Sequence, residues 1–164
     1  MPHSWKGIIA GFLATVVLSL IFVALDAAGI NQFNIVSMID ELGSIQRTAA
    51  WFDHFIVGTL LWGPIFAGFE TTLSEARPRW QKGLLFGLIS WVLMMLIFMP
   101  VIGYGLFGYH KGFVEPAGML VLNLIYGLVL GVVFELLDRK FPTKALVSSE
   151  PPLPEMAQFN KPND

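Results

Sequence analysis

The chain has 164 residues, of which 55% are hydrophobic and 13% are charged, whereas soluble domains carry about a quarter charged residues. It contains no cysteine, which excludes disulfides, thiolate metal sites, iron–sulfur clusters and thiol redox chemistry. The net charge of −2 gives no electrostatic basis for a nucleic-acid partner.

The charged residues gather in short stretches that separate long apolar segments. Three segments lack any charge, and a fourth carries Asp53 and His54 near its start. A bilayer core of about 30 Å needs roughly 20 helical residues, so each segment is long enough to cross it. The sequence therefore predicts an all-α integral membrane four-helix bundle, with the lipid bilayer as its surroundings. The expected spans are about 7–28, 50–69, 83–107 and 117–138.

Two further segments lie outside these spans. Between the first two spans, apolar residues recur at helical spacing over residues 35–42, which predicts a short amphipathic helix on the membrane surface. Residues 142–164 are rich in proline and poor in apolar residues, which predicts an extended tail. We therefore expect a transmembrane domain at 1–141, followed by the tail at 142–164.

The basic residues are divided unequally between the two sides of this arrangement. In loops flanking membrane spans, lysine and arginine favour the cytoplasmic side. One side holds only Arg47 and Lys111. The other holds Lys6, Arg77, Arg79, Lys82, Arg139, Lys140, Lys144 and Lys161. This bias predicts a multi-pass protein with both termini in the cytoplasm.

The first and third spans begin with the same pattern, Lys-Gly-x-x-x-Gly, at Lys6 and at Lys82. An alignment of the second and fourth spans pairs His54 with Asn123 and Gly58 with Gly127. These matches predict an internal repeat of two helical hairpins with the same orientation, and hence a pseudo-two-fold axis along the membrane normal.

Small residues let membrane helices approach closely, and G-x-x-x-G pairs occur in three of the expected spans. Such pairs serve either an interface with another copy or subunit, or packing within the bundle itself. We favour packing within the bundle, because a duplicated hairpin needs close contacts to close on itself. The pairs are Gly7 and Gly11, Gly83 and Gly87, and Gly127 and Gly131.

Ionisable residues at membrane depth are candidates for function. Helix rise places Asp26, Asp53 and His54 at one level near the outer boundary, with Asn123 deeper in span four. They are the candidate polar or ligand site, for a proton, a cation or a polar ligand. The alternative, which we favour, is that Asp26 and His54 tie helix ends to the loop.

At the inner boundary, a second polar set comprises Glu70, Glu135, Asp138, Arg139 and Lys140. We expect the residues of this set on the last span to form an ordinary solvated helix end, and we assign no site there.

Several kinds of membrane cofactor protein need more ligands than this sequence offers. A haem held by two histidines needs both at membrane depth, and only His54 qualifies, since His3 and His110 lie outside the spans. Membrane di-iron enzymes need many histidines. Small four-helix multidrug exporters carry a glutamate in the middle of helix one, where this chain has Thr15 and Ser19. We therefore expect no cofactor, no metal and no catalytic residue.

Three motifs together resemble those of small, uncharacterised bacterial four-span inner-membrane proteins of unknown function. They are Gly7, Ala10, Gly11, Ala14 and Thr15; Trp51, His54, Phe55 and Gly58; and Met99, Pro100, Gly103, Gly105, Phe107 and Gly108. The resemblance covers about residues 7–138 and implies fold and location only. Such proteins often have histidine where this chain has Asn123.

The sequence therefore favours a protein that is not an enzyme, namely an accessory or structural subunit of a larger membrane complex, for example a respiratory one. Its expected partners are other membrane subunits or further copies of itself. The alternative is a small homo-oligomeric transporter or channel with the Asp and His residues at its outward-facing mouth.

Overall fold

The computed structural model describes residues 1–30, Val36 and 47–142, and every regular element within them is a helix. In chain order these are α1 (His3–Ala27), α3 (Arg47–Ile56), η1 (Val57–Trp62), α4 (Gly63–Thr72), α5 (Arg79–Leu93), η2 (Met94–Phe98), α6 (Met99–Val101), η3 (Leu106–Lys111) and α7 (Val114–Lys140). The expected amphipathic helix, apart from Val36, and the tail beyond residue 142 lie outside the described residues.

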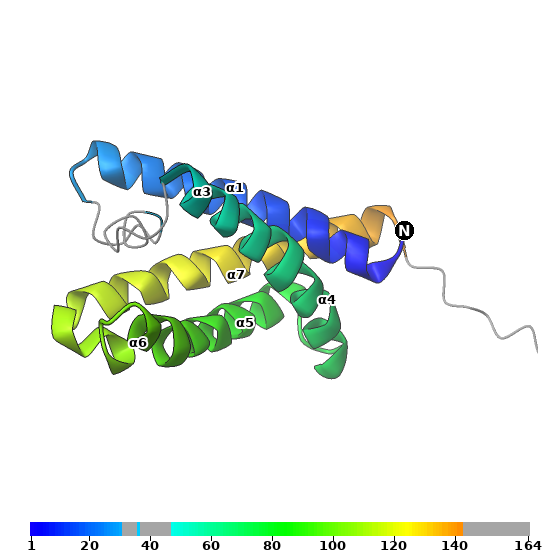
Figure 1. The fold of residues 1–164 in the computed structure, drawn as a ribbon. Coiled ribbons are helices and arrows are strands. Elements are labelled where there is room, and N and C mark those ends of the chain that lie inside the picture. Colours follow the sequence, from blue (N-terminus) through cyan, green and yellow to red (C-terminus); the bar gives the residue numbers. More distant parts are fainter. Residues whose placement is uncertain (31–35, 37–46, 143–164) are drawn as a thin grey trace, which may run out of the picture.

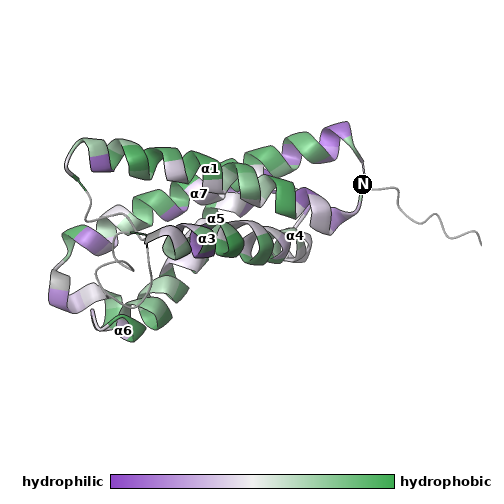
Figure 2. Ribbon diagram, turned by 45° about the horizontal axis from the view of Figure 1, so that its top comes forward, coloured by the Kyte–Doolittle hydropathy of each residue, from purple (hydrophilic) through white to green (hydrophobic). Residues whose placement is uncertain are grey.

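Four continuous helical stretches are long and apolar enough to cross a membrane, which confirms the all-α membrane fold and makes the chain a multi-pass membrane protein. Figure 2 shows hydrophobic residues along the helices, with hydrophilic residues concentrated toward their ends. Numbered as spans one to four, they are His3–Ala27, Thr48–Thr72, Arg79–Val101 and Val114–Lys140.

Spans two and three each contain a stretch of wider, π-helical turns, and in both a proline lies two residues after the end of that stretch. The stretch η1 precedes Pro64, and η2 precedes Pro100. A proline has no N–H to donate, and its ring clashes with the carbonyl group four residues earlier. Those carbonyl groups, of Leu60 and Leu96, lie inside the two π-helical stretches. The wider turns therefore accommodate each proline without ending the span.

Span three ends at Val101, earlier than the expected end at residue 107. The residues that follow form a turn in which Gly103 and Gly105 have φ angles of 82° and 74°. Glycine adopts this left-handed backbone readily because it has no Cβ. Residues 102–107 are mostly apolar, so hydropathy placed them inside span three. Hydropathy carries no information about backbone conformation and therefore could not predict this turn.

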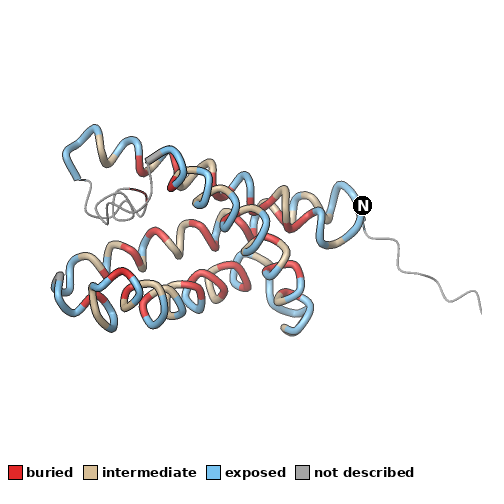
Figure 3. The backbone as a smooth tube through the Cα atoms, viewed as in Figure 1, coloured by how far each residue is buried: buried red, intermediate tan, exposed pale blue. Residues whose placement is uncertain are grey.

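Spans one and four form the centre of the bundle. The helix α1 packs against α7 and α4, α5 packs along α7, and α4 also contacts α5 (Figure 1). The start of α1 and the end of α7 lie at one end of the bundle, which we call the terminal end, and α6 lies toward the other, which we call the distal end. Figure 3 shows the buried residues on the faces that the helices turn toward one another.

Glycine allows the closest of these contacts. A Cβ atom on Gly11 would lie only 2.7 Å from the carbonyl oxygen of Gly58. A Cβ atom added at any other glycine of the predicted set would also overlap a backbone atom of a neighbouring span. The backbone atom belongs to Gly63 for Gly7, to Gly127 for Gly83, to Asn123 for Gly87, to Gly83 for Gly127 and to Arg79 for Gly131. All six glycines of the predicted set therefore lie at helix contacts within this chain.

The contacts of Gly7 and Gly83 are alike, because Gly7 meets Gly63 in the way that Gly83 meets Gly127. The expected alignment pairs Gly58 with Gly127, whereas these contacts put Gly63 in the position of Gly127. The internal repeat itself stays a prediction.

Candidate functional site

The distal half of the bundle contains a cavity of about 660 Å³ that all four spans line. The packing between spans two and three is loose along this cavity: among the described residues α3 makes few or no close approaches to span three, and the two spans meet instead where the Trp62 and Phe86 rings lie 5.6 Å apart and where α4 contacts α5. Most of the lining is apolar. The polar residues in it are Thr15, Asp53, His54, Ser90, Asn123 and Tyr126.

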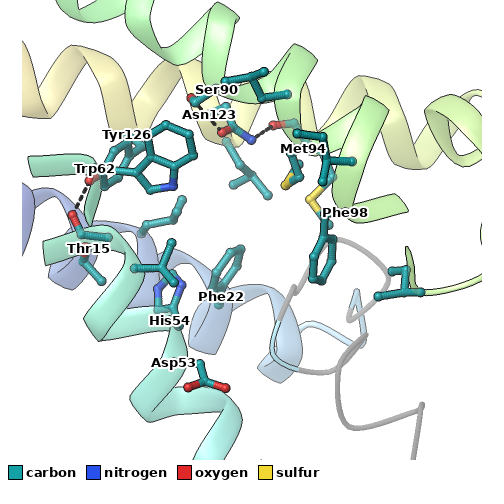
Figure 4. Close-up of a pocket in the computed structure, with 18 of the residues that line it drawn as sticks. Thr15, Phe22, Asp53, His54, Trp62, Ser90, Met94, Phe98, Asn123 and Tyr126 are labelled. Carbon is teal, nitrogen blue, oxygen red and sulfur yellow. Dashed lines mark hydrogen bonds between the residues drawn. The ribbon is translucent and has the colours of Figure 1, made fainter. Parts of the chain in front are cut away.

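Three of the four residues of the predicted polar site, Asp53, His54 and Asn123, line this one cavity. Asp53 and His54 come from α3, and Asn123 lies across the space on α7 (Figure 4). Asp26 is not among the lining residues. It follows Phe22 by one turn of α1, and the Phe22 ring lies 5.5 Å from the His54 ring. The predicted approach of Asp26 to His54 stays a prediction.

His54 is enclosed by aromatic rings. The ring centroids of Phe22, Trp51 and Phe55 lie 5.5, 5.8 and 5.8 Å from that of His54. Its Nε2 atom is buried and has no hydrogen-bond partner among the described residues. A buried polar atom without a partner is costly, so this nitrogen is available to a bound molecule.

The deeper polar residues of the cavity already have partners within the protein. The Tyr126 hydroxyl donates to the carbonyl oxygen of Gly58 at 2.6 Å. The Thr15 hydroxyl can donate either to the carbonyl oxygen of Gly11, at 2.8 Å, or to the Tyr126 hydroxyl oxygen (Figure 4). The Asn123 amide donates to the carbonyl oxygen of Met119 at 2.8 Å. The bond from Tyr126 to Gly58 joins spans four and two, and Asp53 and His54 are left as the groups that a ligand would meet.

The terminal end holds a cluster of charged residues that sequence reasoning missed. Lys6 has no exposed surface, and Lys82 and Glu70 are each only 4% exposed. The Lys6 ammonium forms an ion pair with the Asp138 carboxylate. The Lys82 ammonium donates a hydrogen bond to a carboxylate oxygen of Glu70 at 3.1 Å. We call the full set the terminal ion cluster; it comprises His3, Lys6, Glu70, Arg79, Lys82 and Asp138.

Ion pairs within this cluster join the two hairpins. Lys6 of span one pairs with Asp138 of span four, and Lys82 of span three pairs with Glu70 of span two. Arg79 touches both acids, with its Nη2 2.8 Å from Asp138 and its Nε 3.6 Å from Glu70. A buried charge is tolerated when it is paired and hydrogen-bonded, so these contacts account for burial of the two lysines.

Asp138 belongs to the expected solvated helix end, and its side chain stays partly exposed, but it also pairs with the buried Lys6 and with Arg79. Glu70 of the same polar set is buried. Glu135 and Arg139 pair at an exposed position on α7, as expected for a solvated helix end. A signal was present in the sequence. Each Lys-Gly-x-x-x-Gly motif places a lysine directly before a glycine, and close glycine packing draws that lysine between helices instead of into water.

No group of three or more His, Asp or Glu residues that could hold a metal ion occurs in the part of the chain that the structure describes. Fold and site together define a four-span helical membrane protein with a largely apolar cavity that all four spans line. The chain belongs to a family of unknown function, DUF6789, whose model matches residues 1–144. No curated protein and no solved structure matches the chain.

Proposed function

We propose that this protein is a non-catalytic membrane protein that binds a lipophilic small molecule in the distal cavity. The cavity itself carries the proposal. Its volume of about 660 Å³ falls within the roughly 300–1,000 Å³ of small-molecule sites, which are likewise mostly apolar with a few polar groups. The loose packing between spans two and three provides a sideways opening through which a molecule dissolved in the bilayer reaches the cavity.

The proposal includes location and topology. The location is the bacterial inner membrane, as in the proteins that the sequence motifs resemble. The unequal division of lysine and arginine between the two sides supports a topology with both termini in the cytoplasm. The terminal end is then cytoplasmic and the cavity lies in the outer half of the membrane. A reporter active only in the periplasm, fused after Lys144, is expected to give no signal. A strong signal would contradict this topology.

We also propose that the two hairpins are a duplicated unit. The matching positions of Lys6 and Lys82, and the matching contacts of Gly7 and Gly83, support a common origin.

A second candidate is an accessory subunit of a larger membrane complex. The observation in its favour is the same loose packing between spans two and three, which leaves room for an apolar helix of a partner or of another copy. In this case the opening is a protein interface, and Asp53 and His54 meet polar groups of that partner.

One experiment separates these candidates. The protein is extracted in a mild detergent and examined by native mass spectrometry, together with Ile97→Trp, which places a large ring at the opening. Ile89→Trp is the matched control, because Ile89 lies on the same span and is exposed but does not line the cavity.

A bound small molecule that is lost in Ile97→Trp and kept in Ile89→Trp supports the binding protein. A stoichiometric foreign polypeptide in place of a small molecule supports the accessory subunit and contradicts the first proposal.

A further inference from the structure

Resting on the proposed function, we propose that the ligand of the distal cavity is a hydrophobic cation. The carboxylate of Asp53 would balance its charge, and the aromatic rings around the cavity would receive its apolar body. The argument has three parts: the charges of the lining, the rings in it, and the surroundings of Asp53.

Among the described residues of the lining, one side chain is acidic and none carries an opposite charge to balance it. Asp53 is the single carboxylate of this described lining, which includes neither lysine nor arginine. No ion pair of Asp53 is found in the described part of the chain. The neighbouring His54 offers a nitrogen without a hydrogen-bond partner there. Asp53 is therefore the acidic group that a molecule bound in the cavity would meet.

Aromatic side chains from all four spans face this cavity. Phe22 comes from span one, Trp62 from span two, Phe98 from span three and Tyr126 from span four. In Figure 4, Trp62 and Tyr126 lie on one side of the open space, and Phe22 and Phe98 lie on the other. The face of an aromatic ring is negative and attracts cations. A neutral lipid would make apolar contacts with these rings but would lack this additional attraction.

Asp53 lies at the edge of the cavity, on α3 in the distal part of span two, and it is exposed. A cation bound in the cavity can reach this carboxylate directly, and partial screening by solvent keeps the attraction between the two charges modest. A small hydrated cation is a poor fit, because the rest of the lining offers few oxygen ligands to replace its water.

The test compares two probes of nearly the same shape and opposite charge, tetraphenylphosphonium and tetraphenylborate. Each is titrated into the protein reconstituted in lipid nanodiscs, and specific binding is the saturable part that wild type has and Ile97→Trp lacks. We expect tetraphenylphosphonium to bind at least about tenfold more tightly than tetraphenylborate, which a modest charge interaction of this kind supplies. This comparison needs no substitution at the site.

The variant Asp53→Asn then identifies the responsible charge. It is expected to weaken tetraphenylphosphonium binding about tenfold and to leave tetraphenylborate no weaker. Asp26→Asn is the matched control, because Asp26 is an acid near the end of the neighbouring span but does not line the cavity. It is expected to leave both affinities unchanged.

The outcomes distinguish this inference from the proposed function. Equal binding of both probes, blocked by Ile97→Trp and unchanged in Asp53→Asn, overturns the cation preference but keeps the lipophilic binding site. Preference for tetraphenylborate also overturns it. Absence of saturable binding of either probe contradicts the cation inference, and together with no bound molecule in native mass spectrometry it removes the proposed function as well.

Discussion

At the terminal end, charged side chains are drawn into the protein and paired with one another, whereas at the distal end Asp53 and His54 border an open cavity. The terminal ion cluster joins all four spans through contacts such as those of Lys6 with Asp138 and Lys82 with Glu70. At the distal end, spans two and three pack loosely. The same four helices thus form a closed half and an open half.

The difference separates polar groups that stabilise the bundle from those that are free to bind. In the closed half, each buried charge has an opposite charge within reach, so its removal would leave a partner less well compensated. In the open half, the available groups contribute little to helix packing. Stability and binding should therefore respond to substitutions in different halves, and the following variants test that division.

The largest effect is expected from Lys6→Met, which removes the fully buried member of its ion pair and leaves Asp138 with Arg79 alone. Breaking a buried ion pair costs about 3–5 kcal/mol when no other counter-ion remains. Arg79 offsets part of this cost, so thermal unfolding in detergent should occur at a clearly lower temperature. Lys140→Met is the control, because Lys140 is exposed near the same end of α7. Equal melting of Lys6→Met and wild type would show that the cluster does not hold the terminal end together.

A smaller loss is expected from Gly11→Leu. A side chain at this position would strike the backbone of Gly58 and Gly63 in span two, and overpacking typically costs about 1–3 kcal/mol. Gly68→Leu serves as control, because a Cβ atom there meets nothing within 4 Å. The prediction fails if both variants are recovered from membranes in equal yield and melt together.

Tyr126→Phe should have a moderate effect at the boundary between the two halves. It removes the hydroxyl that donates to the carbonyl oxygen of Gly58 in span two, and loss of one such hydrogen bond costs about 1 kcal/mol. Melting of this variant is compared with that of Tyr109→Phe, whose side chain is largely exposed. A larger loss in Tyr109→Phe would contradict the assignment.

The smallest effect on stability is expected from Asp53→Asn. Asp53 is exposed at the cavity opening, and surface substitutions usually change stability by less than about 0.5 kcal/mol. The melting temperature should stay that of wild type while cation binding falls. A clear loss of stability would place Asp53 with the structural groups of the closed half.

Much of the fold could be predicted because hydropathy and span length are properties of the chain itself. The end of span three was missed, since it depends on the left-handed backbone at Gly103 and Gly105. The depth of a residue in the membrane can be counted along a helix from the sequence. This count placed Asp53, His54 and Asn123 in one candidate site, and all three line one cavity. The cavity itself could not be foreseen, because it arises where two spans pack loosely. Burial of Lys6 was missed for a related reason: its counter-ion lies on another hairpin.

The exchange of counter-ions between hairpins has a consequence for how the protein is made. The ribosome delivers spans one and two first, so Lys6 enters the membrane long before Asp138 is synthesised. The contacts of Lys6 with Asp138 and of Glu70 with Lys82 therefore form only once the second hairpin has been inserted. Each half contributes a lysine and an acid that pair with the opposite charge on the other half, so two separately synthesised halves would have the means to recognise one another.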